Sequence, residues 1–430
     1  MVIDLSEDEK AVGEGFELVR IGEETAEQVH EVPQKYIMIR TIRPKYVVRP
    51  ARAAVQDEAM SSEIRVAPLP PRILPRSIAT PSLLASVLTG KFCDGLPFYR
   101  QERIFARHGL TISRQDIANW TIAIVTRLES VLTLMQAELL SSSYLYCDET
   151  FFQVMDEPGR ANSTQSYMWG TTGGVLYQYS RTRSSSFIIT FLSSYAGFLQ
   201  TDGYDGYNTI GEKEGIVHVD CWAHARRKFV EELKLSGGES SAAQIIAMIS
   251  ILYEHETKLR GLHFGKGIAN GCHSLHGGTP HCRHASLQSN RGMAPRKGCR
   301  SPTPIGAWQG YLVHLGPMAE AHLLYRLPNL TPDSNEAERA IRPFTIGRKN
   351  WVIPGGPRGA FASAALYSVI ETAKTCALEP YYYLRYILTK LPTTDSSDLP
   401  SLLPWNADPK DFGELTAEDA RISLDSIPID

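Results

Sequence analysis

Two short, largely apolar runs of this chain each end on an aspartate. Tyr144–Cys147 leads into Asp148, and Phe198–Thr201 leads into Asp202. Runs this short that are rich in aromatic and apolar residues are typical of strands. Carboxylates at the ends of neighbouring strands can meet at one edge of a sheet. The chain is therefore expected to fold around a sheet that carries acids at its edge.

A third acid, Glu338, lies in a segment that predicts a capped helix. Ser334 or Asn335 can cap its start, and Pro343 is expected to end it, because the residue before a proline avoids the helical region. Glu338 and Arg342 are four residues apart and can pair. Two interpretations stay open at this point, a surface ion pair and a catalytic carboxylate.

Asp148, Asp202 and Glu338 together can hold a pair of divalent metals, which would clamp the attacking and leaving oxygens of a phosphodiester. Magnesium suits carboxylates and water better than zinc does. The alternative is that each acid is a solvated terminus, since the chain has 47 acids.

Further strands and helices alternate around these acids, which predicts an α/β core. A hairpin is expected around Gly173 and Gly174, and one segment fits a strand or a helix equally well. The strands are expected at 167–170, 175–179 and 215–220, the helix at 226–235, and the ambiguous segment at 187–192.

Four segments resemble the insertion-sequence sixty-six family of bacterial transposases: Leu199–Tyr204, Cys221–Phe229, Ser334–Trp351 and Ala364–Lys374. The resemblance extends from about Leu5 to about Trp405 with one break. It implies an RNase H-like core of the retroviral-integrase type. It also implies an Asp-Asp-Glu triad, which falls on Asp148, Asp202 and Glu338.

The resemblance further implies a DNA transposase that uses two Mg²⁺ or Mn²⁺ ions to cleave and transfer DNA strands. Its partners would be terminal inverted repeats, target DNA, further copies of the chain and possible accessory proteins, in the bacterial cytoplasm and nucleoid. A second hypothesis is a partly frameshifted, inactive remnant that at most binds DNA.

His218, Asp220, Cys221 and His224 cluster in the sequence. His224, Arg226 and Arg227 are interpreted as contacts to DNA phosphates or to the triad, while a packed cysteine and a satisfied histidine remain equally open. The complete set of candidate DNA-binding residues is His224, Arg226, Arg227, Arg339, Arg342, Arg348, Lys349, Arg114, Gln115 and Asn119.

The N-terminal half is basic, with 14 Lys and Arg against 6 Asp and Glu from Lys35 to Asp116. This excess favours DNA binding over a merely solvated basic face. Residues 79–140 are helical by pattern. A glycine turn at Gly109 between two amphipathic segments resembles a helix-turn-helix whose second helix is capped by Ser113.

Residues 1–50 predict a β-rich piece with strand material at Tyr36–Val48, followed by a proline-rich linker at 51–78. Relatives carry a four-cysteine zinc site in this piece. The matching positions here are Ala11, Glu14, Val48 and Ala51, so no zinc is expected. Relatives also begin with a longer helical segment, so the chain is expected to be shortened at its start.

Residues 238–329 form an insertion within which residues 262–324 differ from the rest. This window has one acid, Glu320, and seven of the twelve histidines. One hypothesis is a zinc site from Cys272–His276 and His281–His284. The preferred one is a shifted reading frame, restored by Leu327–Leu330, whose product would be disordered.

The catalytic core is expected at 141–237 and 330–375, with a C-terminal helix and tail at 376–430. No run has the roughly 18 apolar residues of a membrane helix, and the acidic start does not resemble a signal peptide. Seven scattered cysteines fit reduced thiols in a cytoplasm.

Overall fold

The computed structural model describes residues 35–48, 64–172, 175–236, 241–263, 331–351 and 354–413, with scattered positions between 5 and 29. The chain divides into two units, one of residues 1–42 with 426–430 and one of residues 43–425. All helices and strands named below belong to the second unit.

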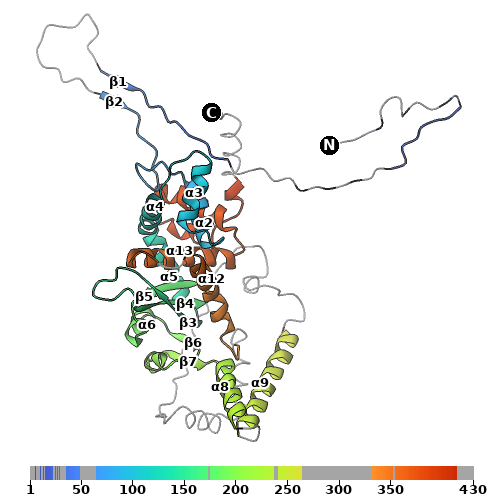
Figure 1. Ribbon diagram of the computed structural model, residues 1–430, viewed down its shortest axis with the longest axis vertical. Coiled ribbons are helices and arrows are strands. Elements are labelled where there is room, and N and C mark those ends of the chain that lie inside the picture. The colour runs from blue at the N-terminus through green and yellow to red at the C-terminus, as the bar shows by residue number, and fades with distance from the viewer. Residues whose placement is uncertain are drawn as a thin grey trace, which may run out of the picture. The chain divides into compact units, whose positions relative to one another are not determined.

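A five-stranded mixed sheet organises this unit (Figure 1). Its order is β5-β4-β3-β6-β7, in which β3, β4 and β5 are antiparallel while β6 and β7 run parallel to β3. The strands are β3 (Tyr144–Gln153), β4 (Gln165–Thr172), β5 (Leu176–Ser180), β6 (Gly197–Thr201) and β7 (Ile216–Asp220). The expected strands and the α/β class are confirmed, although Gly173 and Gly174 lie outside the described residues.

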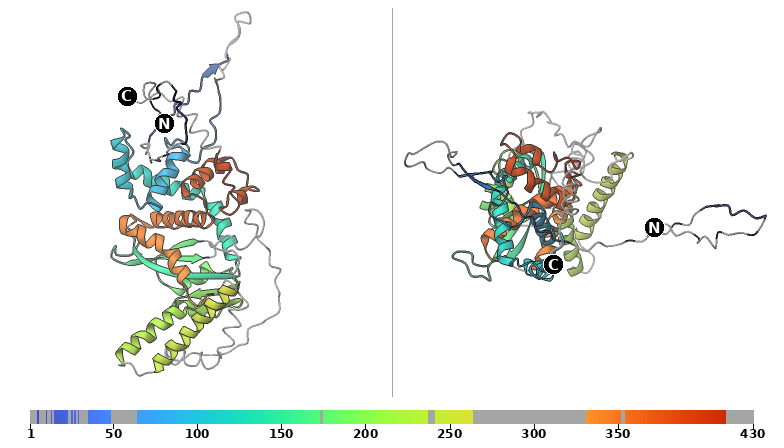
Figure 2. Two further views of the ribbon diagram at one scale, coloured as in Figure 1. Left: turned by 90° about the vertical axis from the view of Figure 1, so that its right-hand side faces the viewer. Right: turned by 90° about the horizontal axis from the view of Figure 1, so that it is seen from above.

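Helices cover both faces of the sheet (Figure 2). On one face Met168 and Tyr177 pack with residues of α12 (Asn335–Trp351) and α13 (Pro357–Thr375). On the other face Trp169 and Leu176 pack with α6 (Ser185–Phe191) and α7 (Asn208–Gly211). Successive strand residues point to opposite faces, so both faces need apolar side chains.

The remaining helices flank this core, and the segment that fitted a strand or a helix is helix α6. Helix α8 begins at Trp222, four residues before the expected start, and packs against α9. The other helices are α2 (Pro81–Phe92), α3 (Phe98–Arg107), α4 (Arg114–Arg127), α5 (Glu129–Leu140), α8 (Trp222–Leu235), α9 (Ser241–His263) and α14 (Pro380–Lys390).

The prediction that Pro343 ends its helix is wrong, because α12 continues through Pro343 to Trp351. An interior proline costs about 3 kcal/mol. Packing offsets that cost, since Phe344 is completely buried and its ring contacts those of Phe152 and Tyr367 edge to face. Tertiary packing thus overrides the local signal.

The β-rich interpretation of the N-terminal piece is also too broad. Of Tyr36–Val48, only β1 (Lys45–Val47) is a strand, and it pairs with β2 (Ile64–Val66), inside the expected linker. Both strands are exposed throughout. Met38 and Ile42 are 69% and 80% exposed, so no core selects a longer strand here.

Several sequence predictions concern residues outside the described ranges. These are the zinc hypothesis, the frameshift hypothesis for 262–324 apart from its first two residues, which end α9, most of the absent-zinc positions, and the tail from 414. Among the described helices, none is by itself long and apolar enough to cross a membrane. Helices α4 and α5 reach that length only together, across a bend of 58°, and both contribute buried side chains to the core.

Candidate active site

Strand register brings the two aspartates to the same level of the sheet. Tyr146 of β3 pairs with Gln200 of parallel β6, so Asp148 and Asp202 each follow two residues later. Asp220 ends the next strand, β7, and pairs there with Thr201, the residue before Asp202. Asp148, Asp202 and Asp220 therefore lie at neighbouring levels of the sheet. The prediction that Asp148 ends its strand is wrong, because β3 continues to Gln153 and Asp148 pairs with Gly170 of β4.

Helix α12 delivers Glu338 to this part of the sheet because the residues that precede it are bound to the sheet. Tyr146 Oη lies 2.9 Å from Thr331 Oγ1, and Gln200 Nε2 donates to the Thr331 carbonyl at 3.0 Å. The Trp222 N–H donates to the Pro332 carbonyl at 2.9 Å. The Ser334 N–H, just before the helix, donates to Cys221 Sγ at 3.2 Å.

Asp148 has the most perturbed carboxyl of this group. Burial raises its pKa to about 7, and the charges of Glu149, Asp202 and Glu338 add to the rise. The Glu149 N–H opposes it by donating to Asp148 Oδ1 at 2.8 Å. The register of β3 and β6 places Asp148 and Asp202 at one level of the sheet, and α12, which carries Glu338, packs against β3 and β4.

Glu149 and Arg183 are site residues that the sequence reasoning missed. The Glu149 side chain is 1% exposed, and Arg183 Nε donates to its Oε1 at 2.6 Å while Tyr207 Oη donates to its Oε2 at 2.7 Å. The Arg183 guanidinium also stacks on Tyr204, 3.6 Å from the ring centre. The Tyr204 N–H in turn donates to Asp202 Oδ1 at 3.0 Å. These contacts link Asp202 to the strand that carries Asp148.

The two histidines of the sequence cluster have different neighbours. His218 Nε2 shares a hydrogen bond of 2.9 Å with Thr201 Oγ1 and lies 3.6 Å from Asp220 Oδ1. Burial lowers the pKa of His218 and raises that of Asp220. His224 Nε2 lies 3.5 Å from Glu338 Oε1.

Cys221 is buried, with 2% of its surface exposed. Burial alone would raise the pKa of its thiol, but hydrogen bonding with His224 and Ser334 outweighs that effect and lowers it. A hydrogen bond with Cys221 raises the pKa of His224. The packed cysteine and the triad-contacting histidine, offered as alternatives, therefore occur together.

The predicted DNA-binding residues have mixed surroundings. Arg348 is held against β3, since its Nη1 donates to Thr150 Oγ1 at 3.0 Å and to the Phe151 carbonyl. Among the described residues, the Arg342 side chain has no such hydrogen bond to a strand and makes no ion pair with Glu338. The exposed members are Arg114, Gln115, Asn119, Arg226, Arg227, Arg339, Arg342 and Lys349.

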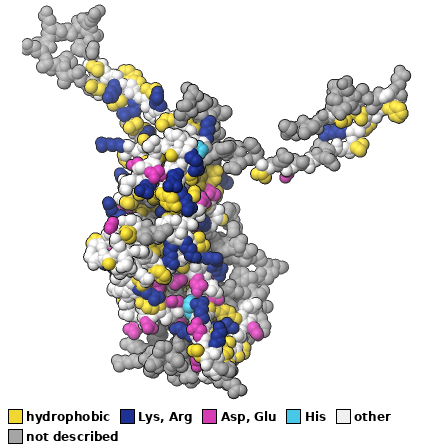
Figure 3. Space-filling view, in the orientation of Figure 1, with side chains coloured by type: hydrophobic (Ala, Val, Ile, Leu, Met, Phe, Trp, Pro, Cys, Tyr) yellow, Lys and Arg dark blue, Asp and Glu magenta, His cyan; other side chains and the backbone are white. Residues whose placement is uncertain are grey.

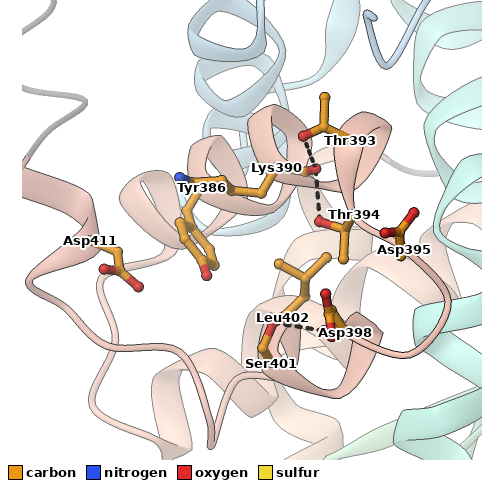
Figure 4. A pocket seen from close by; sticks show the side chains of 9 residues that line it. All are labelled: Tyr386, Lys390, Thr393, Thr394, Asp395, Asp398, Ser401, Leu402 and Asp411. Carbon is orange, nitrogen blue, oxygen red and sulfur yellow. Dashed lines mark hydrogen bonds between the residues drawn. The ribbon is translucent and has the colours of Figure 1, made fainter.

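Acidic, basic and histidine side chains gather where α12 meets α8 (Figure 3). An open pocket of about 760 Å³ lies beside this region and is lined by Arg226, Tyr253, Asp333 and Asn335, among others. A second pocket, of about 290 Å³, is formed by α14 and the segments after it, and no triad residue lines it (Figure 4).

The donor atoms of the triad are all carboxylate oxygens, which suits a hard cation such as Mg²⁺ or Mn²⁺. In the described part of the chain, however, no three acidic, histidine or cysteine side chains are spaced to hold an ion as they stand. A metal would therefore have to draw these side chains closer together. Without a metal, repulsion between Asp148 and the neighbouring carboxylates opposes that approach.

Two family models and several known proteins are similar to this chain. The model of the Transposase IS66 family matches residues 76–362, and that of the IS66 C-terminal element matches residues 368–405. Uncharacterized protein y4qI of Sinorhizobium fredii (strain NBRC 101917 / NGR234) is 29% identical over 433 positions, which cover 93% of this chain and 74% of that protein. Uncharacterized protein y4jD of the same strain is 29% identical over 427 positions, which cover 90% and 76%. No solved structure is significantly similar to the chain.

Proposed function

The chain belongs to the Transposase IS66 family, and we propose that it cleaves the DNA ends of an insertion sequence and transfers them to a target. The observation that supports this proposal is the strand register that brings Asp148 and Asp202 to the same level of the sheet, against which α12, the helix of Glu338, packs. Family membership makes DNA the partner and implies dependence on a divalent metal.

The core is proposed to be RNase H-like. Support comes from the strand order, with three antiparallel strands followed by two that run parallel to the central β3. The first acid lies on the central strand, the second follows the neighbouring parallel strand, and the third lies on a helix that packs across β3 and β4. These positions support the triad that the sequence resemblance implies.

Asp148, Asp202 and Glu338 would hold two Mg²⁺ or Mn²⁺ ions. When bound, such ions activate water and neutralise charge on the phosphate. The chain itself orients the acids: the Tyr204 N–H fixes Asp202, and the contacts of Thr331, Pro332 and Ser334 fix the start of α12. His224, whose Nε2 lies 3.5 Å from Glu338 Oε1, would restrain that carboxylate.

The proposal is tested with the full chain, DNA that carries the element's ends, and Mg²⁺ or Mn²⁺. Wild-type protein should nick the ends and join the freed 3′-hydroxyl to a second DNA. Asp202→Ala should abolish both products. As a matched control, Asp205→Ala changes a nearby exposed acid and should leave both. Full activity of Asp202→Ala would rule the proposal out.

The second candidate is an inactive remnant, and the unusual composition of residues 262–324 favours it. Sequencing the coding DNA across codons 255–330 separates the two candidates. A frameshift there, together with no DNA cleavage by the protein as it is now encoded, would support the remnant. An uninterrupted frame and an active protein would exclude it.

A further inference from the structure

We propose that α3 is a docking surface for the phosphate backbone of duplex DNA, separate from the candidate active site. This inference rests on the proposed function, because that function makes DNA the partner. It assigns a role to Arg100, Arg103 and Arg107, none of which was among the residues predicted to bind DNA. Dark-blue side chains lie over the part of the molecule that holds α3 (Figure 3).

The helix is fixed so that its arginines face outward. Gln101 and Phe105 are its buried residues, and Gln101 Nε2 donates to the carbonyls of Val87 at 3.1 Å and Leu96 at 3.0 Å. Tyr99, Arg103 and Arg107 are spaced four residues apart, so they follow one exposed stripe of about 12 Å. Arg100 lies next to this stripe.

The acids close to this stripe are engaged in other contacts. Glu102 Oε1 accepts the N–H of Arg114 at 3.1 Å, at the start of α4. Asp116 completes a capping box with Ser113, whose hydroxyl donates to Asp116 Oδ2 at 2.6 Å. Within the described part of the chain, Arg100, Arg103 and Arg107 have no acidic partner. Their charges therefore remain available to an anionic partner.

Tyr99 holds two of these arginines in place before any partner binds. Arg100 Nε donates to Tyr99 Oη at 3.0 Å, and the guanidinium carbons of Arg100 and Arg103 lie 5.7 Å and 6.0 Å from the Tyr99 ring centre. A side chain that is already ordered loses less conformational entropy when it binds. The contacts with Tyr99 therefore favour binding of an anionic partner by Arg100 and Arg103 over the alternative that these side chains are merely solvated.

Duplex DNA fits this surface because it carries one negative charge per about 1.7 Å of its axis, so a 12 Å stripe faces about seven charges. Arginines on a helix face contact phosphates without reading sequence. On α4, by contrast, the predicted groove residues Gln115 and Asn119 bond each other, Nε2 to Oδ1, at 3.1 Å. The structure thus favours backbone contact by α3 as the source of affinity in this region.

The test measures binding of the full chain to a duplex of about 20 base pairs as salt is raised from about 50 to 300 mM, with EDTA present. Each lost phosphate contact lowers the slope of log affinity against log salt by about 0.9. R100A/R103A/R107A should therefore have a slope shallower by about 3 and bind at least tenfold more weakly. R100K/R103K/R107K, which keeps the charges, should retain most of the slope.

The matched control is R358A/K390A/K410A, which removes the same charge from exposed positions elsewhere. It should keep the wild-type slope, and equal thermal unfolding of the variants would show that all are folded. A slope for the α3 variant equal to that of this control would overturn the proposal. Because binding is measured without metal and needs no cleavage, the slope reports the α3 surface whether or not the active-site proposal holds, so failure of that proposal is distinguishable.

Discussion

The imidazole of His224 lies beside the carboxylate of Glu338, with Nε2 3.5 Å from Oε1. The two residues come from α8 and α12, and most of the residues between these helices belong to the insertion predicted at 238–329. Contacts from Tyr146, Gln200 and the turn before α8 hold residues 331–334 immediately upstream of Glu338. Glu338 is therefore positioned by contacts with the core and not by the segment that connects α8 to α12.

His224→Ala should slow DNA cleavage by about 10- to 100-fold, the usual cost of losing a group that orients a ligand. Thermal stability should change little, because the His224 side chain is partly exposed. His224→Gln should recover part of the rate, since its amide can still donate to Glu338. Cleavage by His224→Ala at the wild-type rate would show that Glu338 needs no such support.

Arg183→Ala should destabilise the protein by about 2 kcal/mol in urea unfolding, because it leaves the Glu149 carboxylate buried without its ionic partner. This value lies below that of a fully buried pair, since Arg183 is 38% exposed. Arg183→Ala combined with Glu149→Gln should recover most of the loss. Additive losses in the double variant would mean that the two side chains do not interact.

Asp148→Asn should stabilise the metal-free protein at pH 8 but not at pH 4. The folded-state pKa of Asp148 is raised to about 7, so the wild-type protein loses stability as pH rises from about 4 to about 7 and the carboxylate must ionise. Asp148 is only partly buried, so screening by solvent reduces the effect, and we expect on the order of 1–2 kcal/mol. Denaturant unfolding in EDTA at both pH values measures it, and a gain that is larger at pH 4 would contradict the assigned shift.

Gly197→Ala should destabilise the core by about 3 kcal/mol or more. Gly197 has a φ of +155°, and a Cβ there would lie 2.6 Å from the Ser143 carbonyl oxygen and 2.7 Å from Tyr195 Oη. The obstacle is backbone, so it cannot swing aside. Gly159→Ala is the control, because its Cβ would meet open space despite a φ of +74°, and it should cost about 1 kcal/mol. Equal unfolding midpoints for the two variants would contradict this packing.

The strands and the place of Asp202 could be predicted from the sequence because short apolar runs and their ends are local signals. The place of Asp148 inside β3 could not, because the polar residues after it remain in the strand through pairing with β4. The end of α12 could not, since the burial of Phe344 outweighs the local cost of Pro343. Glu338 was placed by resemblance and not by spacing, because its position depends on hydrogen bonds from Tyr146 and Gln200 to a distant segment.

Glu149 and Arg183 were missed because they are 34 residues apart and meet only in the folded sheet. A signal was nonetheless present. Glu149 lies two residues after buried Cys147 and so on the same face of the strand. An acid on such a face needs a cation or donors nearby, and this requirement could have directed a search for a partner such as Arg183.

The central claim is that Asp148, Asp202 and Glu338 act as one metal-dependent centre. The most direct test is the rate of DNA nicking in Mn²⁺ by each single alanine variant and by the triple variant. Residues that act as a unit are not additive, so each single variant should be as slow as the triple variant. A single variant that nicks DNA at nearly the wild-type rate would remove that residue from the centre and contradict the account.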